Sequence, residues 1–204
     1  MKTLNCPNCG AQTPIALKGI KVATCASCGT TLMINDVQVQ SAGQQGEMHD
    51  APLLFGIGDQ VQLGRTPTLI LGHARYSYGR GFWDEFCGVD GDGRTCWISL
   101  DEGDVVRQKR LTGKDTPKFM PPFKLGETLD FDAATFTVTE VEHAECIALR
   151  GQFDEVLQVG ESHEFVNASA GDEALLSGEF WPGHAIWFYG RWYDAFDVKV
   201  QRQP

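Results

Sequence analysis

The stretch TFTVTEVE, residues 135–142, alternates polar with apolar side chains over most of its length and is rich in β-branched residues. Alternation with a period of two sends successive side chains to opposite faces of a strand, whereas an amphipathic helix repeats every 3.6 residues. β-Branched and aromatic residues also favour strands, because they pack well on a pleated surface. The stretch therefore predicts a half-buried β-strand.

The same pattern continues from Leu53 to the end of the chain. DQVQLG (59–64) and CWISL (96–100) alternate, PTLILGHARY (67–76) is typical of a buried strand, and AIWFYGRWYDAFDVKV (185–200) closes the chain. Gly or Asp interrupts these runs every several residues, and none of them has a helical period. We therefore expect a mainly β fold built from small β-barrel-like or SH3-like units.

One hairpin is predicted with particular clarity. The sequence DGDG at 90–93 lies between two strand-like stretches and supplies residues that tolerate positive φ. A turn centred between residues 91 and 92 would set Cys87 directly opposite Cys96, whereas a turn one residue later would not. The sequence leaves open whether these cysteines pair.

Two matches inside the strand-rich part indicate an internal repeat. FGIGDQVQL, which starts at Phe55, aligns with FKLGETLDF, which starts at Phe123. GFWDEF, residues 81–86, aligns with GQFDEV, residues 151–156, at nearly the same offset.

The repeat divides this part of the chain. We expect a first β-unit at 53–110 and a second at 123–204, which ends in an aromatic hairpin. Between them, residues 111–122 contain three prolines, which cannot donate hydrogen bonds in a central strand. This segment is predicted to be a connector.

The N-terminal segment carries two Cys-x-x-Cys pairs separated by fifteen residues, a spacing typical of a zinc site. A glycine follows each pair, where the chain must turn sharply away from a metal ion. Four thiolates close a tetrahedron and leave no vacant position, which indicates one structural Zn²⁺. The expected ligands are Cys6, Cys9, Cys25 and Cys28, in a zinc ribbon at 1–36 followed by a linker at 37–52.

Composition limits the location and partners. The 204 residues carry 17 Lys and Arg against 27 Asp and Glu, a formal charge of −10, so nucleic-acid phosphates would be repelled over most of the surface. No stretch approaches the roughly 20 apolar residues of a membrane helix, and the N-terminus lacks the features of a signal peptide. We expect a cytoplasmic protein with no transmembrane segment, in which thiols stay reduced.

No nucleophile elbow, phosphate loop or Cys-His signature occurs, so we predict no catalytic residue and no organic cofactor. Asp84 and Glu85 are adjacent and would point to opposite faces of a strand, so they cannot act as a paired acid and base. Aromatic residues and these two carboxylates remain as candidates for a partner or ligand surface. The candidates are Trp83, Asp84, Glu85, Trp97, Trp187 and Tyr189.

The strand start FGIGDQVQLG, the motif GFWDEF and the aromatic tail after a ribbon together resemble bacterial proteins of domain of unknown function family 4178. Trp83, Glu85 and Phe86 match that family's Trp-x-Glu-aromatic motif, and the resemblance spans about residues 54–200. In the second half, Phe153 replaces the Trp and Val156 the aromatic residue. The resemblance implies an accessory role in a membrane-associated bacterial stress system and no assigned activity.

We therefore expect a non-catalytic zinc-binding protein that acts as a protein-interaction or accessory module, with an unidentified protein partner and room for peripheral membrane association. Two alternatives stay open. The first is an enzyme or small-ligand binder, which a large cleft between the β-units would support. The second is a nucleic-acid accessory factor, which the charge balance disfavours.

Overall fold

The computed structural model describes residues 2–35 and 38–202, and it confirms a mainly β fold. Within this part of the chain, helical structure is limited to two short 3₁₀ turns, η1 (Gly113–Asp115) and η2 (Ala195–Asp197). None of its helices has the length and apolar content needed to cross a membrane. The strands are β1 (Lys2–Asn5), β2 (Gln12–Ile15), β3 (Val22–Thr24), β4 (Thr30–Ile34), β5 (Val39–Gln44), β6 (Gln60–Leu63), β7 (Thr66–Ser77), β8 (Phe82–Asp90), β9 (Thr95–Asp101), β10 (Asp104–Arg110), β11 (Thr128–Phe131), β12 (Ala134–Phe153), β13 (Ser162–Ala170), β14 (Ala174–Trp181), β15 (His184–Tyr193) and β16 (Lys199–Gln201).

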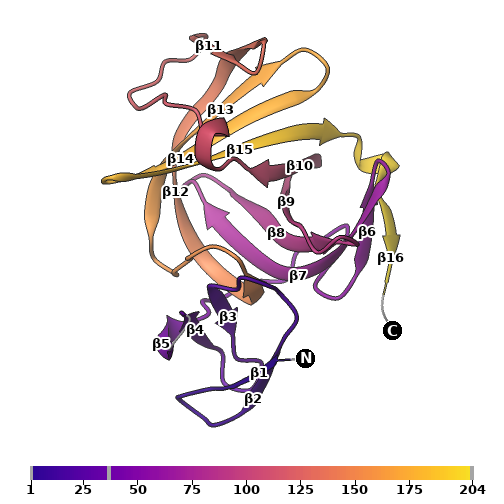
Figure 1. Cartoon of the computed structure of the whole chain (residues 1–204), viewed down its shortest axis with the longest axis vertical. Helices are drawn as coiled ribbons and strands as arrows, with labels where there is room; N and C mark the ends of the chain where they lie inside the picture. The colour runs from indigo at the N-terminus through magenta and orange to yellow at the C-terminus, as the bar shows by residue number, and fades with distance from the viewer. Residues whose placement is uncertain (1, 36–37, 203–204) are drawn as a thin grey trace.

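Eight of these strands form a closed antiparallel ring, which we call the central barrel. Its strands run in the order β7, β8, β9, β10, β15, β14, β13 and β12, and β12 pairs with β7 to close the ring (Figure 1). The region expected at 53–110 supplies β7 to β10, and the region expected at 123–204 supplies β12 to β15. Each region is thus a four-stranded meander, and the two meet along both edges.

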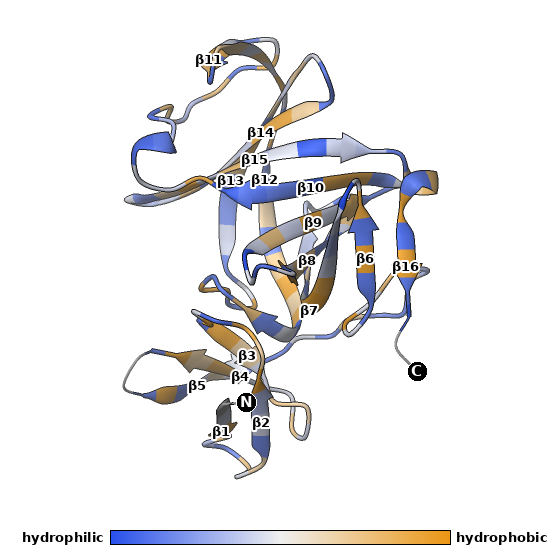
Figure 2. Cartoon of the chain, turned by 45° about the vertical axis from the view of Figure 1, so that its right-hand side comes forward, coloured by the Kyte–Doolittle hydropathy of each residue, from blue (hydrophilic) through white to orange (hydrophobic). Residues whose placement is uncertain are grey.

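Each meander also packs an outer core of its own. β6 and β16 cover the outer face of β7 to β10, where Phe55, Ile70 and Phe86 are buried. β11 and the start of β12 cover the outer face of β13 to β15, where Phe136 and Trp187 are buried. Strand β6 and the edge strand β16 beside it show alternating hydrophilic and hydrophobic bands in Figure 2.

The central core lies between the two meanders. β15 shows how alternation builds it, because Ile186 and Phe188 point into the central core while Trp187 and Tyr189 point to the outer one. Both faces of this aromatic strand are therefore occupied by packing.

The first pair of aligned stretches adopts the same backbone turn at the start of each meander. The Gly58 amide donates to the carbonyl of Ile70 at 2.9 Å, and the Gly126 amide donates to the carbonyl of Val138 at 2.8 Å. Both glycines have positive φ, which explains the residue type. The same kind of turn occurs a third time at Gly160, before β13.

The second pair of aligned stretches does not occupy equivalent positions. GFWDEF at 81–86 begins β8, whereas GQFDEV at 151–156 ends β12 and continues into the following turn. The DGDG sequence does form a hairpin between β8 and β9, but Cys87 pairs with Trp97 and not with Cys96. Cys87 belongs to the central core, while Cys96 lies 3.7 Å from the Thr68 hydroxyl on the other face.

Two glycines permit the closure of the ring. Gly72 in β7 lies opposite Gly151 in β12, and Gly151 has a φ of +86°. A Cβ on Gly151 would overlap the carbonyl oxygen of Leu71, and one on Gly72 would overlap that of Gln152. The two strands approach closely here because neither residue has a side chain.

The N-terminal module consists of the β1–β2 hairpin and a small sheet of β3, β4 and β5. Strand β5 lies inside the segment predicted to be a linker at 37–52, because the open edge of β4 supplies hydrogen-bonding partners for it. The linker is therefore only partly irregular. The boundary expected between residues 36 and 37 lies outside the described residues.

The module closes one end of the barrel (Figure 1). β3 continues the sheet by pairing with the end of β12, and Val22 and Leu17 enter the central core beside Phe153. The Gln152 side chain accepts hydrogen bonds from the amides of residues 16 and 17 at 2.9 and 3.1 Å. This end of the barrel is consequently filled by side chains of the N-terminal module.

Candidate functional site

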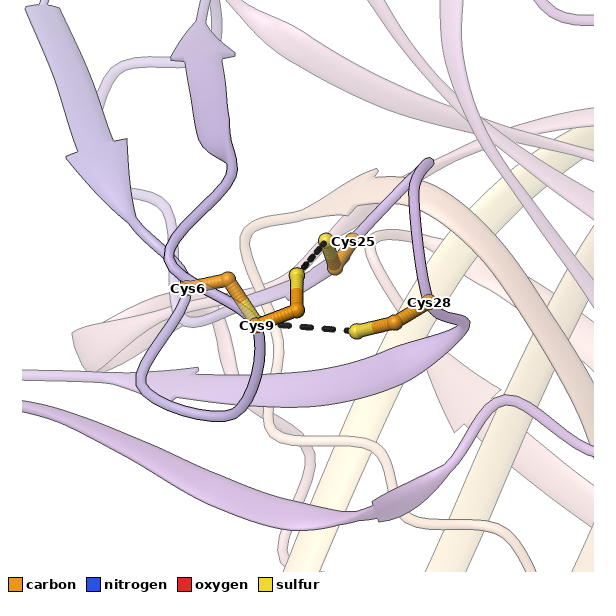
Figure 3. A group of neighbouring side chains, drawn as sticks. All are labelled: Cys6, Cys9, Cys25 and Cys28. Atoms are coloured by element: carbon orange, nitrogen blue, oxygen red, sulfur yellow. Dashed lines mark hydrogen bonds between the residues drawn. The ribbon is translucent and has the colours of Figure 1, made fainter.

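The two Cys-x-x-Cys loops bring four sulfur atoms to one point, as Figure 3 shows. The Sγ atoms all lie within 4.8 Å of one another, and the Cys6–Cys28 and Cys9–Cys25 pairs are each 3.7 Å apart. Four sulfurs at about 2.3 Å from a single tetrahedral ion would lie roughly 3.8 Å apart. The group fits one metal ion.

The two loops have the same backbone geometry. The Gly10 amide donates to the carbonyl of Cys6 at 2.8 Å, and the Gly29 amide donates to that of Cys25 at 2.9 Å. Gly10 and Gly29 have φ values of +76° and +69°, a conformation that costs little only for glycine. The spacing thus folds locally into two matched turns that present their sulfurs inward.

Polar groups next to the cysteine sulfurs shift the pKa values of the thiols. Hydrogen bonds from the hydroxyl and backbone of Thr30 lower the pKa of Cys28 to about 6. The Ala11 amide lowers the pKa of Cys9, but the neighbouring thiols outweigh it and raise the value to about 11. Four adjacent thiols cannot all ionise without a compensating cation, and a metal ion supplies that charge.

A second feature lies inside the barrel, at the end opposite the N-terminal module. A cavity of about 190 Å³ opens between the two meanders and is lined from β8, β9, β10, β12, β13, β14 and β15. An eight-stranded barrel has an interior just wide enough to be filled by side chains or to hold one small ligand. The lining residues are Tyr78, Trp83, Glu85, Ser99, Asp101, Asp104, Val106, Gln108, Glu140, Phe165, Asn167, Leu175, Ser177, Glu179 and Trp192.

A chain of hydrogen bonds organises one wall of the cavity. The Trp83 indole and the Ser99 hydroxyl donate to the same oxygen of Glu85, at 3.2 and 3.1 Å. The Gln108 amide in turn donates to the Ser99 hydroxyl at 3.3 Å. Glu85 and Gln108 are 8% and 5% exposed, so these groups are fixed within the barrel.

Burial raises the pKa of several carboxyl groups in the barrel. Burial raises the pKa of Glu85 despite the two hydrogen bonds that the side chain accepts. Burial and the nearby Glu85 together raise the pKa of Glu179 well above its usual range. Burial and the charges of neighbouring acids raise the pKa of Asp101 to about 6. Just after the end of β12, burial raises the pKa of Glu155 to about 7, although the Arg110 Nη1 atom lies 3.2 Å from its Oε1 atom.

The residues predicted as a partner or ligand surface are divided among several places. Trp83 and Glu85 line the cavity, whereas Trp97 is buried in the central core, where it stacks on Phe153. Trp187 is 1% exposed in an outer core, and Tyr189 lies on the same outer face. These two do not join the cavity.

Asp84 points to the opposite face from Glu85, as alternation predicts. It accepts a hydrogen bond from Arg75 Nε at 2.8 Å and lies 2.6 Å from His73 Nε2. Burial would raise the pKa of Asp84, but these contacts outweigh it and hold the pKa below the usual range. Arg75 also donates to the carbonyl of His49, so this buried group fastens the segment before β6 to the barrel.

Sequence reasoning missed the carboxylates that face Glu85 across the cavity. Glu179 lies within the apolar strand β14, two residues after Ser177 and four after Leu175. Alternation along the strand therefore places all three side chains on the inward face. An acidic residue at an inward position was the available signal. Its proximity to Glu85 depends on barrel closure, which local patterns do not specify.

The fold and sites define a closed antiparallel β-barrel with a four-cysteine module at one end and an acidic cavity at the other. Residues 56–195 match the family described as "Domain of unknown function (DUF4178)", and the chain belongs to this family. The matched range includes the Trp83 and Glu85 motif and every strand of the central barrel. No curated protein and no solved structure matches the chain.

Proposed function

We propose that the protein binds a small molecule in the cavity between its two meanders without transforming it, and that its four cysteines hold one structural zinc ion. The observation that carries the first part is the cavity itself, whose wall combines aromatic rings with buried polar groups that converge from both meanders. Ligand sites in proteins have this composition, and they occur in the mouths of β-barrels.

The proposal of zinc rests on the donor set. Four thiolates in a closed tetrahedral arrangement favour zinc over harder ions, and no position remains for a substrate. The ion would hold the N-terminal module together, and the module in turn fills the barrel end through Val22 and Leu17. Elemental analysis of freshly purified, reduced protein should find about one zinc per chain, and its absence would overturn this part.

Ligand binding can be tested with a variant that fills the cavity. Ser177 lines the cavity, so Ser177→Phe should occupy the space, whereas Ser162→Phe adds the same ring at an exposed position. A low-molecular-mass extract of the native cell should raise the melting temperature of the wild type and of the Ser162 variant but not of the Ser177 variant. If Ser177→Phe does not fold, Leu175→Phe serves the same purpose. Failure of every extract fraction to stabilise the wild type would overturn ligand binding.

An accessory role with a protein partner is a second proposal. It is supported by Phe196, a 98% exposed aromatic residue in η2, and by Leu125, which is 70% exposed. Exposed apolar residues can serve as contact points for a partner. A cytoplasmic location and peripheral membrane association belong to the same proposal. Crosslinking in native cells should capture one partner with the wild type and less of it with Phe196→Ser, and equal capture would contradict the role of Phe196.

A further inference from the structure

The cavity wall is acidic on all sides. Among the described residues that line it, five are carboxylic acids and none is a lysine, an arginine or a histidine. Glu85 and Asp101 come from one meander, and Glu140 and Glu179 come from the other. A ligand between them would therefore be surrounded by groups of a single charge sign.

Several of these groups lack a hydrogen-bond donor. The Oε1 atom of Gln108 and the Oδ1 atom of Asp101 are buried without a partner among the described residues. Glu179, which is 9% exposed, likewise has no hydrogen-bonding partner in the part of the chain that the structure describes. Buried acceptors without donors are costly, so the wall is complementary to a ligand that supplies N–H groups.

A bare metal ion does not fit this arrangement. Within residues 2–35 and 38–202, the four cysteines are the group of His, Cys, Asp or Glu side chains close enough to share an ion, and the cavity carboxylates form no such group. Hard divalent ions need several oxygen ligands at 2.0–2.6 Å from one point. Carboxylates that are spread around a cavity suit a larger organic ion better.

Aromatic rings complete the wall. Trp83, Phe165 and Trp192 line the same space as the acids, and the Trp83 and Phe165 rings pack at a centroid distance of 5.2 Å. Aromatic faces attract organic cations and also cover the apolar part of such molecules. A wall that combines aromatic rings with hydrogen-bond acceptors favours an organic cation over an inorganic one.

We infer that the cavity binds an organic ammonium ion that carries both N–H donors and an alkyl portion. The inference rests on the proposed function, since it names the ligand class for the same cavity. The N–H groups pair with Glu179, Asp101 and the free oxygen of Gln108, and the alkyl portion packs on the aromatic rings. The raised pKa of Glu179 agrees with this, because a cation would compensate the charge that burial disfavours.

A set of probes that share a six-carbon chain tests each part of the inference. Hexylamine and 1,6-diaminohexane carry charge and N–H donors, hexyltrimethylammonium carries charge without N–H donors, and 1-hexanol is neutral. Isothermal titration calorimetry should show binding of the two amines to the full-length protein at pH 8. The quaternary ion and the alcohol should each bind roughly tenfold or more weakly, as expected for losing charged hydrogen bonds.

Two variants with the same change in charge locate the site. Glu179→Gln should weaken amine binding by about tenfold or more, because a charged acceptor is replaced by a neutral one. Glu164→Gln lies outside the set of residues that line the cavity, and it should leave amine binding unchanged. If Glu179→Gln does not fold, Asp101→Asn provides the second test.

The outcomes distinguish this inference from the proposed function. If the cell extract stabilises the protein but neither amine binds, or if 1-hexanol binds as tightly as hexylamine, the cavity binds another class of ligand and the inference is overturned alone. If neither extract nor amine binds, both are overturned. Amine binding that responds to Glu179→Gln and not to Glu164→Gln supports both.

Discussion

The two ends of the barrel carry anionic groups in opposite arrangements. At one end, four sulfurs converge within 4.8 Å, and neighbouring side chains seal the barrel below them. At the other end, five acids are spread around a hollow space. Close convergence places all four sulfurs within reach of one small ion that offsets part of their charge, whereas dispersed acids require either protonation or a larger cation.

The two arrangements also predict different effects of a substitution on stability. A ligand of a closed metal site acts together with its three neighbours, so removing one weakens the whole site. A carboxylate in the cavity acts largely by its own desolvation and its distance from other charges. We therefore expect large effects that affect the whole module at the sealed end and smaller, pH-dependent effects at the hollow end.

The largest effect is expected for Cys25→Ser. The variant should lose essentially all bound metal, because structural zinc sites contribute on the order of 10 kcal/mol and depend on all four ligands. Hydrogen exchange should accelerate over residues 2–35 while the barrel strands remain protected. Ser27→Ala, at an exposed position in the same loop, should retain the metal. Retention of one metal ion by Cys25→Ser would contradict the closed four-sulfur site.

A pH-dependent effect is expected at Glu155. Its folded pKa of about 7 exceeds the ordinary value of 4.5, so its contribution to stability is present below about pH 4.5 and is lost as the pH rises through 7. The difference corresponds to roughly 3 kcal/mol at high pH. The charged or titratable groups that interact with it include Arg110, Asp154, Glu85 and Glu179.

Glu155→Gln removes this titration. Relative to the wild type, the variant should therefore gain stability between pH 5 and pH 8, by roughly 2 to 3 kcal/mol. Urea unfolding at the two pH values measures the gain. Glu164→Gln, which makes the same change in charge at a partly buried position in β13, should show no such trend. A Glu155 variant that tracks the wild type at both pH values would show that burial does not raise this pKa.

A third effect concerns the coupling of the two ends. Val22 is fully buried, and Val22→Ala leaves a small void between the N-terminal module and the barrel, at a cost of about 2 kcal/mol. All five tryptophans lie at or beyond position 83, so tryptophan fluorescence reports on the barrel alone. The fluorescence-detected urea midpoint should fall for Val22→Ala and not for Val156→Ala, which is 56% exposed. An unchanged midpoint would mean that the module does not stabilise the barrel.

Sequence alone predicted the features that depend on local spacing. The positions of Cys6 to Cys28 fix two identical turns, and the alternation at residues 135–142 marks a half-buried part of β12. The hairpin at residues 90–93 follows in the same way from turn chemistry. Each of these features depends only on residues that are close in the sequence or on one kind of turn that occurs twice.

Features that depend on closure of the ring were not predicted. The cavity combines Glu85 with Glu179, and these residues meet because β10 pairs with β15 and β7 pairs with β12. Register between distant strands is set by packing and by close contacts such as Gly72 with Gly151, which no local pattern encodes. Strand β5 lies in the predicted linker for the same reason, because its pairing partner, the edge of β4, is formed only when the module folds.

The smallest effect is expected for Ser99→Ala, which removes one of the two donors to Glu85. Hydrogen bonds to a charged carboxylate are about twice as strong as neutral ones, so the cost should be about 1.5 kcal/mol at pH 9 and about half of that at pH 4. The raised pKa of Glu85 should rise further in the variant, because the hydroxyl favours the ionised form. Urea unfolding at both pH values, with the exposed Ser162→Ala as the control, measures the difference. An equal loss of unfolding free energy at the two pH values would show that Glu85 does not ionise in this range. The negative charge at the acidic end of the barrel would then come from the other cavity carboxylates.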